Sequence, residues 1–160
     1  MAENLNKLNG KTIVITGASS GFGRGSVLRL AESGANIVAA ARRSKVLEEL
    51  SSQIVVKGGN VSIVTCDVSK FSDIEKLAQN AIDNFGTIDI WINNVGIGAL
   101  GFFWDIPIQD HARLIDVNLK GLVYGSYVAI QHFIMKEKGI LINIGSIDSE
   151  VPLAMQTHMQ

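Results

Sequence analysis

Cysteine and proline are scarce in this sequence of 160 residues, which contains one cysteine and two prolines. A single cysteine excludes a disulfide within the chain. Cys66 lies in the apolar run VSIVTC, which favours a buried, reduced thiol. The first residues, MAENLNKLNGK, form no apolar segment of the kind that begins a signal peptide. We therefore expect a cytoplasmic protein whose cysteine stays reduced.

An excess of charge of one sign is also absent, because 14 Lys and Arg residues stand against 15 Asp and Glu residues. No basic stripe or run of like charges occurs, so the sequence gives no sign of a basic surface that would bind nucleic acid or an anionic membrane. The most apolar long segment, IDIWINNVGIGALGFFW, is interrupted by Asp89, Asn93, Asn94 and several glycines, which argues against a membrane span. We expect neither nucleic acid nor a membrane as a partner.

The remaining composition is typical of a well-packed globular protein, with 47% hydrophobic and 18% charged residues. No repeat, low-complexity tract or proline-rich linker divides the chain. Its length is in the range of one domain that buries a sizeable core. We expect a single domain over residues 1–160.

Short runs of β-branched and apolar residues alternate with longer segments of helical spacing. The short runs are mostly apolar on both faces, as expected of parallel strands that helices cover on each side. The predicted strands are residues 12–16, 36–41, 61–66, 88–93 and 140–144. This order predicts an α/β fold, namely a doubly wound, Rossmann-like parallel sheet with about five strands.

The clearest predicted helix covers residues 72–85 and carries one continuous apolar stripe. Ser72 and Glu75 have the spacing of a capping box at its start, and Gly86 is expected to end it. Of the other helices, one is expected to end at Gly34 and the next to start near Ser44.

A long helical segment is predicted from Pro107 to about Lys138. Small residues at three of its positions leave room for close packing: Gly121, Gly125 and Ala129.

Three glycines follow the first predicted strand in the stretch TGASSGFG, residues 16–23. In doubly wound sheets this turn commonly takes a phosphate on the helix N-terminus. Gly17, Gly21 and Gly23 remove side chains where the backbone would approach a pyrophosphate. Their spacing differs from the common G-x-G-x-x-G fingerprint, and a plain tight turn explains the cluster alone about as well. The position between a strand and a helix favours cofactor binding.

Five motifs, in the same order and at matching intervals, resemble those of the short-chain dehydrogenase/reductase family. They are TGASSGFG at residues 16–23, CDV at 66–68, NNVG at 93–96, NLKG at 118–121 and INIGS at 142–146. The resemblance extends from Gly10 to about Pro152, and Val95 stands where the family usually has alanine. It implies a nicotinamide dinucleotide held across the carboxyl ends of the strands.

The choice of dinucleotide can be argued from AAARRS at the end of the second strand. A carboxylate there would bind a ribose 2′-hydroxyl, whereas cations would neutralise a 2′-phosphate. The chain has Arg42 and Arg43 and no carboxylate, so we predict NADP(H), with NAD(H) as the second choice. Arg42 is expected to be the main phosphate partner, with Ser19 or Arg43 assisting. Two arginines in a solvated loop are the alternative interpretation.

The resemblance implies that four further residues lie near the adenosine half of the cofactor. Asp67 and Val68 would line the adenine, with the Asp67 carboxylate directed at its exocyclic amine. Asn93 and Gly96 would lie nearby. Alternatively, Asp67 is an ordinary turn residue at a strand end, and Asn93 holds neighbouring backbone together.

The family's chemistry implies a hydride carrier, a tyrosine that exchanges a proton with the substrate oxygen, and a lysine that assists that tyrosine. It also implies a serine that polarises the carbonyl and an asparagine on the long helix that maintains a water-linked proton path. Ser146 matches the serine and Asn118 the asparagine. Alternatively, Ser146 caps the strand end and Asn118 satisfies backbone groups in a bent helix.

The tyrosine and the lysine have no counterpart in the sequence. The family's spacing from Ser146 puts the tyrosine at Met159 and the lysine beyond Gln160. Methionine donates no proton, and nothing in the sequence positions the neighbouring His158 for that role. Family members continue with two further strands, so we expect a chain cut short before its Tyr-x-x-x-Lys motif.

The expected function is that of an NADP(H)-dependent oxidoreductase that interconverts an alcohol and a carbonyl. The alternatives are a nucleotide-binding module without turnover and a remnant that does not fold alone. We expect a small carbonyl or hydroxyl substrate of apolar character and no metal site. The resemblance also implies a homo-oligomer if the full-length chain exists.

Overall fold

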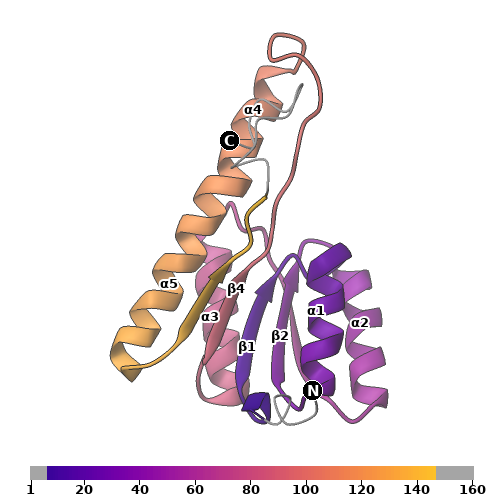
Figure 1. The fold of residues 1–160 in the computed structure, drawn as a ribbon, viewed down its shortest axis with the longest axis vertical. Helices are drawn as coiled ribbons and strands as arrows, with labels where there is room; N and C mark the ends of the chain where they lie inside the picture. Colours follow the sequence, from indigo (N-terminus) through magenta and orange to yellow (C-terminus); the bar gives the residue numbers. More distant parts are fainter. Residues whose placement is uncertain (1–6, 147–160) are drawn as a thin grey trace.

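Strands and helices alternate along residues 7–146, the part of the chain that the computed structural model describes (Figure 1). The strands are β1 (Thr12–Thr16), β2 (Asn36–Ala41), β3 (Asn60–Thr65), β4 (Ile90–Asn93) and β5 (Ile140–Asn143). The helices are α1 (Gly21–Glu32), α2 (Ser44–Val56), α3 (Phe71–Phe85), α4 (Ile108–Leu114) and α5 (Gly121–Lys136), with a π-helical turn, η2 (Ile115–Lys120), before α5. All five predicted strands are present, with ends displaced by at most two residues.

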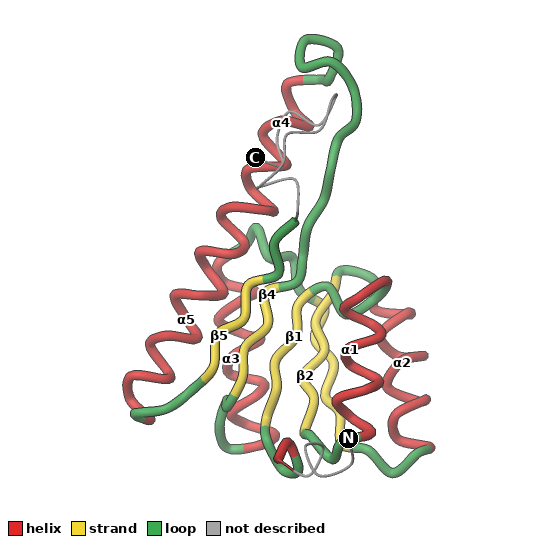
Figure 2. The backbone as a smooth tube through the Cα atoms, in the orientation of Figure 1, coloured by secondary structure: helices red, strands yellow, loops and turns green. Residues whose placement is uncertain are grey.

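The strands form one parallel sheet in the order β3-β2-β1-β4-β5. The chain builds outward from β1 through β2 and β3, and then in the other direction through β4 and β5. Figure 2 shows the sheet between α1 and α2 on one side and α3 and α5 on the other. The prediction of a doubly wound, Rossmann-like sheet is confirmed. Such sheets bind ligands beyond the carboxyl ends of the strands, where the winding reverses. Here the reversal lies between β1 and β4.

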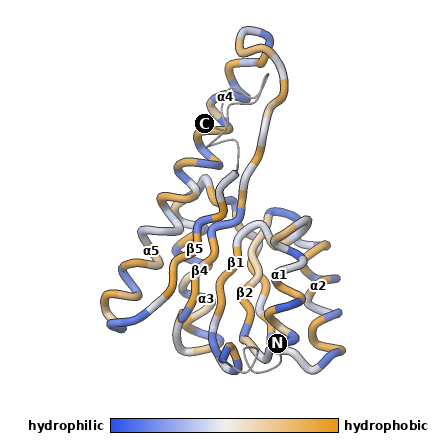
Figure 3. Tube along the Cα trace, in the orientation of Figure 1, coloured by the Kyte–Doolittle hydropathy of each residue, from blue (hydrophilic) through white to orange (hydrophobic). Residues whose placement is uncertain are grey.

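The two faces of the sheet bury separate apolar clusters, because successive residues of a strand point to opposite faces. Ile13 and Ile15 of β1 pack in the cluster under α1 and α2, together with Val27. Val14, between them, packs in the cluster under α3 and α5, together with Leu77. Figure 3 shows the strands as largely apolar segments between the helices. Burial on both faces therefore explains why the strand sequences are nearly continuous apolar runs.

Helix α3 differs from its prediction at the start and agrees with it at the end. The helix begins at Phe71, with Lys70 at the N-cap and no side-chain hydrogen bond at that cap. The predicted capping box of Ser72 and Glu75 is wrong, because Ser72 already lies inside the first turn. Gly86 ends the helix as predicted, with a left-handed φ of 76°.

The long helical segment is present, with Pro107 as its N-cap, and continues through α4, η2 and α5. Its small residues allow the close packing that was predicted. A Cβ added at Gly121 would lie 2.7 Å from Val68 Cγ2, and one added at Gly125 would collide with Asn93 Oδ1. Ala129 is completely buried. These positions let the long segment lie directly against the sheet and the loop after β3.

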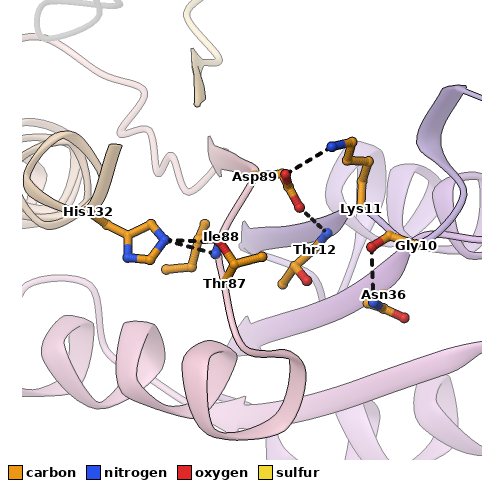
Figure 4. A network of polar contacts seen from close by, with 8 residues as sticks. All are labelled: Gly10, Lys11, Thr12, Asn36, Thr87, Ile88, Asp89 and His132. Carbon is orange, nitrogen blue, oxygen red and sulfur yellow. Dashed lines mark hydrogen bonds and ion pairs between the residues drawn. The ribbon is translucent and has the colours of Figure 1, made fainter. Parts of the chain in front are cut away.

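The segment before β4 is held by a side chain of α5 (Figure 4). The backbone N–H of Ile88 donates to His132 Nε2 at 3.1 Å, and Thr87 Oγ1 lies 3.3 Å from the same nitrogen. β4 begins at Ile90, two residues later than predicted, and the N–H of Ile88, at the predicted start, bonds to a histidine side chain and not to a neighbouring strand.

The same network ties the start of β4 to the start of β1 (Figure 4). The Asp89 carboxylate accepts a hydrogen bond of 3.0 Å from the Thr12 N–H and forms an ion pair of 3.1 Å with Lys11 Nζ. The starts of the two central strands are therefore held by side-chain contacts in addition to the sheet ladder.

Candidate functional site

The glycine-rich turn joins the carboxyl end of β1 to the N-terminus of α1. Gly17 has a φ of 71° and Gly21 a φ of 52°, left-handed values that favour glycine. Gly23 has no such φ, but a Cβ there would collide with the backbone oxygen of Gly17. All three predicted glycines are required by the turn itself, for two different reasons.

Asn94 fastens this turn to the end of β4, a role that the sequence analysis missed. Its backbone N–H donates to Thr16 Oγ1 at 3.0 Å. Its side-chain Nδ2 donates to the Thr16 carbonyl at 3.2 Å and to the Gly17 carbonyl at 3.5 Å. A Cβ at Gly17 would lie only 2.9 Å from that Nδ2. The only signal in the sequence was the second asparagine of the NNVG motif.

A cavity of about 370 Å³ opens beside the turn, at the carboxyl ends of the strands. Of the predicted cofactor-binding residues, seven line it: Gly17, Ser19, Arg42, Arg43, Asp67, Val68 and Gly96. The strand order brings together loops that are far apart in the sequence, because the ends of β1, β2, β3 and β4 are neighbours. Gly21 and Gly23 shape the turn without lining this cavity.

The two predicted arginines stand in different environments at the rim of this cavity. Arg43 Nε and Nη2 donate to Ser19 Oγ at 3.2 and 2.9 Å, which joins the end of β2 to the glycine turn. The Arg42 side chain makes no hydrogen bond within residues 7–146, and its charge acts on the titration of the Asp67 carboxyl. Both arginines are exposed at the rim, and Arg43 is held there by Ser19.

The wall after β3 carries one carboxylate and one neutral thiol. Burial raises the pKa of Asp67, but hydrogen bonds from Ser69 Oγ (2.8 Å) and the Ser69 N–H (3.1 Å), together with the Arg42 charge, leave that pKa below its ordinary value. Burial, aided by Asp73 and Asp67, raises the pKa of the Cys66 thiol to about 12. At neutral pH this wall holds an ionised Asp67 and an uncharged Cys66.

Asn93 lies apart from the first cavity and uses its amide inside the protein. Its Oδ1 accepts from Trp91 Nε1 at 2.8 Å, and its Nδ2 donates to Ser126 Oγ at 3.1 Å and to Asn143 Oδ1 at 2.9 Å. These contacts support the alternative interpretation, in which Asn93 holds β4, β5 and α5 together.

A second cavity, of about 860 Å³, continues from the first. Both predicted catalytic residues, Asn118 and Ser146, line it, and so does Asn93. Its apolar wall includes Leu114, Ile115, Leu119, Leu122 and Ile144. The two cavities share the walls made by Phe22, Val68, Asn94, Val95, Gly96, Ile97 and Val117. They therefore form one elongated site at the reversal of winding.

Asn118 holds the loop after β4 against η2. The Ile97 N–H donates to Asn118 Oδ1 at 2.9 Å, and Asn118 Nδ2 donates to the Ile97 carbonyl at 2.8 Å. The Asn118 amide therefore satisfies backbone groups of the loop after β4, and not those of its own helix. Ser146 is half-buried in the same cavity. Met159 and His158 lie outside the described residues.

Residues 7–146 contain neither a helix long and apolar enough to cross a bilayer nor a group of three or more His, Cys, Asp or Glu side chains placed to hold a metal ion.

Comparison with known sequences identifies relatives over most of the chain. The family model for short chain dehydrogenase matches residues 11–158. The chain is 41% identical over 144 residues to the uncharacterized oxidoreductase YxnA of Bacillus subtilis, covering 89% of this chain and 40% of that protein. It is 37% identical over 147 residues to 3beta-hydroxysteroid dehydrogenase 1 of Eggerthella lenta, covering 91% and 56%. The chain spans about half the length of the curated relatives it matches.

Solved structures share the fold over nearly the whole chain. A short-chain type dehydrogenase/reductase from Mycobacterium marinum superposes with a TM-score of 0.92 at 28% identity, covering 99% of this chain and 66% of that one. A short chain dehydrogenase/reductase from Burkholderia phymatum, in complex with NAD, gives 0.92 at 29% identity, covering 95% and 54%. This chain therefore belongs to the short-chain dehydrogenase/reductase family of oxidoreductases, whose fold binds a nicotinamide cofactor.

Proposed function

We propose that this chain binds NADP(H) and is the cofactor-binding part of an oxidoreductase that interconverts an alcohol and a carbonyl. The observation that carries the choice of NADP(H) is the pair Arg42 and Arg43 at the end of β2, on the rim of the first cavity. Two of the solved structures contain NAD or NAD+, so the fold alone does not decide between the dinucleotides. The choice rests on the residues at this position.

The turn after β1 has the features that a diphosphate needs. The first turn of α1 contains no acidic residue, and the Ser20 N-cap makes no side-chain capping bond among the described residues. The first N–H groups of a helix lack intrahelical partners and favour an anion. Gly17 and Gly23 allow the tight turn that leads into this end of the helix, because a Cβ at either position would crowd Asn94 or the Gly17 carbonyl.

A 2′-phosphate fits the rim better than a 2′-hydroxyl does. Asp67 is the only carboxylate among the described residues that line the first cavity, and it lies after β3, not after β2. Arg42 has no hydrogen-bond partner within residues 7–146 and is available for a phosphate. Arg43 and Ser19 are already joined, so the Ser19 hydroxyl, which accepts from Arg43, can direct its own proton to a phosphate oxygen. Asp67 and Val68 would then face the adenine.

The second cavity provides the place for a substrate. A bound dinucleotide supplies or accepts a hydride there. The Ser146 hydroxyl is proposed to donate a hydrogen bond to the substrate oxygen, and Asn118 to keep the wall at Ile97 in position. The apolar wall, and the similarity to a 3beta-hydroxysteroid dehydrogenase, support a carbonyl or hydroxyl substrate of apolar character.

A nucleotide-binding module without turnover is the second candidate. Met159 favours it, because this thioether stands where the family's spacing puts the proton-exchanging tyrosine. Hydride transfer from NADPH to a panel of carbonyl compounds, followed by the loss of NADPH absorbance, separates the two candidates.

The cofactor proposal is tested with Arg42→Ala and calorimetric titration of NADP+ and NAD+. We expect the variant to bind NADP+ about tenfold more weakly, about 1.4 kcal/mol, because a charge-assisted bond to the 2′-phosphate is lost. NAD+ affinity should be unchanged. Arg29→Ala, on an exposed arginine of α1 that pairs with Glu32, is the matched control and should leave both affinities unchanged. An equal loss of affinity for the two dinucleotides would rule out Arg42 as the residue that recognises the 2′-phosphate.

A further inference from the structure

A further cavity, of about 320 Å³, lies between the loop after β4 and helix α4. We call it the distal cavity, and it is lined by Ile97, Gly98, Ala99, Asp110, Arg113 and Leu114. Ile97, Gly98 and Leu114 also line the second cavity, which holds Ser146. A ligand that extends from the second cavity along this shared wall therefore reaches Asp110 and Arg113.

The loop that forms one wall of the distal cavity is fastened at two points to the helical segment that forms the other wall. Asn118 bonds to both the N–H and the carbonyl of Ile97, at 2.9 and 2.8 Å. Further along the loop, the Phe103 carbonyl lies 3.0 Å from Nε2 of the buried His111, and the two rings pack with centroids 4.5 Å apart. The two walls are therefore fixed relative to each other, as in a pre-formed ligand site.

The distal cavity carries two charges of opposite sign. Asp110 and Arg113 are three residues apart on α4 and so share one face of that helix. Both residues are exposed, and neither side chain makes a hydrogen bond or an ion pair within residues 7–146. Charged side chains in solvent are common and alone indicate no ligand. These two, however, line a cavity that continues from the apolar cavity proposed to hold the substrate.

The pair favours a neutral polar group over an ion. Asp110 would repel an anion bound at Arg113, and Arg113 would repel a cation bound at Asp110. A hydroxyl group avoids both penalties, because its proton can be donated to the carboxylate while its oxygen accepts from the guanidinium. Hydrogen bonds to ionised partners are also stronger than those between neutral groups. A ligand with an apolar body and a hydroxyl group at its far end matches both the apolar wall and the charged pair.

We propose that Asp110 and Arg113 form a specificity subsite for a second hydroxyl group, at the end of the substrate that is remote from the reacting oxygen. The inference rests on the proposed function, because it takes Ser146 as the partner of the reacting oxygen and the second cavity as the place of the apolar body. It narrows the substrate class from a compound of apolar character to an elongated apolar compound with an oxygen function at each end.

The test compares octane-1,8-diol with octan-1-ol on the chain saturated with NADP+. The two compounds share the apolar body and one hydroxyl group, and only the diol has a second one. NMR titration of the backbone amides gives both dissociation constants, and it locates each ligand through Gly145 of the second cavity and Ala99 of the distal cavity. We expect the diol to bind about tenfold more tightly than the alcohol, and only the diol to shift the Ala99 amide strongly.

Substitution of Arg113 assigns this preference to the subsite. Arg113→Ala should weaken binding of the diol about tenfold, to the affinity of the alcohol, and leave the alcohol itself unchanged. Arg113→Lys keeps a charged donor and should retain most of the preference. Gln109→Ala, on an exposed residue of α4 that lines neither the second nor the distal cavity, is the matched control and should alter neither affinity. Thermal unfolding shows whether each variant retains the fold, as expected for exposed side chains.

The outcomes separate this inference from the proposed function. If neither compound shifts the Gly145 amide, the second cavity is not the substrate site, and the inference falls with that part of the proposed function. If both compounds bind there with equal affinity, or if Arg113→Ala leaves the preference intact, only the inference is overturned. Tighter binding of 8-hydroxyoctanoate than of the diol would also overturn it, because the subsite would then select an anion.

Discussion

At residue 125, the absence of a methyl group decides whether α5 can lie against β4. A Cβ on Gly125 would collide with Asn93 Oδ1 and lie 2.9 Å from Trp91 Nε1. These two atoms form a buried hydrogen bond of 2.8 Å, so neither can move without breaking it. We expect Gly125→Ala to lower the free energy of unfolding by about 2 kcal/mol, the usual cost of overpacking, measured by urea denaturation.

Gly25 is the matched control for this prediction. It is also a helical glycine, in α1, but an added Cβ would meet nothing within 4 Å. Alanine is the better helix former, so Gly25→Ala should raise the free energy of unfolding by about 0.5 to 1 kcal/mol. Two substitutions with the same chemistry should therefore have opposite signs. Effects of the same sign would contradict the packing seen at Gly125.

At the scale of elements, α5 is tied to the start of β4 through His132. Its Nε2 accepts the Ile88 N–H, so this nitrogen must be unprotonated for the contact to form. Burial lowers the pKa of His132, the charge of Lys136 lowers it further, and Asp89 acts in the opposite direction. The net pKa lies below the ordinary value of 6.5. The folded chain therefore takes up this proton less readily than the unfolded chain.

The pH dependence of stability follows from this shift. As the pH falls below 6.5, the unfolded state gains the proton first, so the free energy of unfolding decreases until the pH lies below the folded-state pKa. His132→Gln retains an acceptor oxygen that does not titrate, and it should remove this part of the decrease. Urea denaturation from about pH 8 to about pH 5, at constant ionic strength, measures both proteins. Parallel curves would show that another group is responsible.

The helices and strands were largely predictable, because hydrophobic periodicity and the residues that begin or end an element are local properties of the sequence. The predicted bounds of β1 and β2 agree with the structure at every residue, and Gly86 ends α3 as predicted. The π-helical turn η2 was not predicted. Its side chain Asn118 bonds to the backbone of Ile97, 21 residues earlier in the chain, and helical spacing carries no information about such a contact.

For the whole molecule, a single cooperative domain is a prediction that unfolding can test. Trp91 is completely buried against α5, whereas Trp104 is 77% exposed and stacks on Phe102. In Trp104→Phe, fluorescence reports on Trp91 alone. We expect its transition to coincide with that of circular dichroism, as in a two-state domain. Separate transitions would contradict a single domain.

NADP+ should raise the stability of the whole domain, because its proposed site spans loops from four strands. A ligand at about 100 times its Kd adds about 2.7 kcal/mol to the free energy of unfolding. The midpoint of the coincident transitions should rise with NADP+ concentration, with inorganic phosphate as the control. A midpoint that does not respond to NADP+ would contradict the proposed site.

Self-association of the full-length protein stays a prediction. Helix α5 exposes five large apolar side chains: Val123, Tyr127, Ile130, Ile134 and Met135. An apolar surface of this kind is typical of a surface that contacts another element or another chain. It supports the expectation of a homo-oligomer.

The sequence by itself determined the alternation of strands and helices and the glycine turn, because each is recognised from residues that are close together in the chain, and the alternation in turn predicted the doubly wound sheet. It also identified Arg42 as a candidate, since the strand end that carries it could be recognised locally. Only the tertiary structure decided that Asn93 bonds inside the protein, that Asn94 fastens the turn, and that Asp110 and Arg113 line a cavity that continues from the second one. These features depend on which loops become neighbours after the crossovers, and the neighbours come from segments that no local pattern connects.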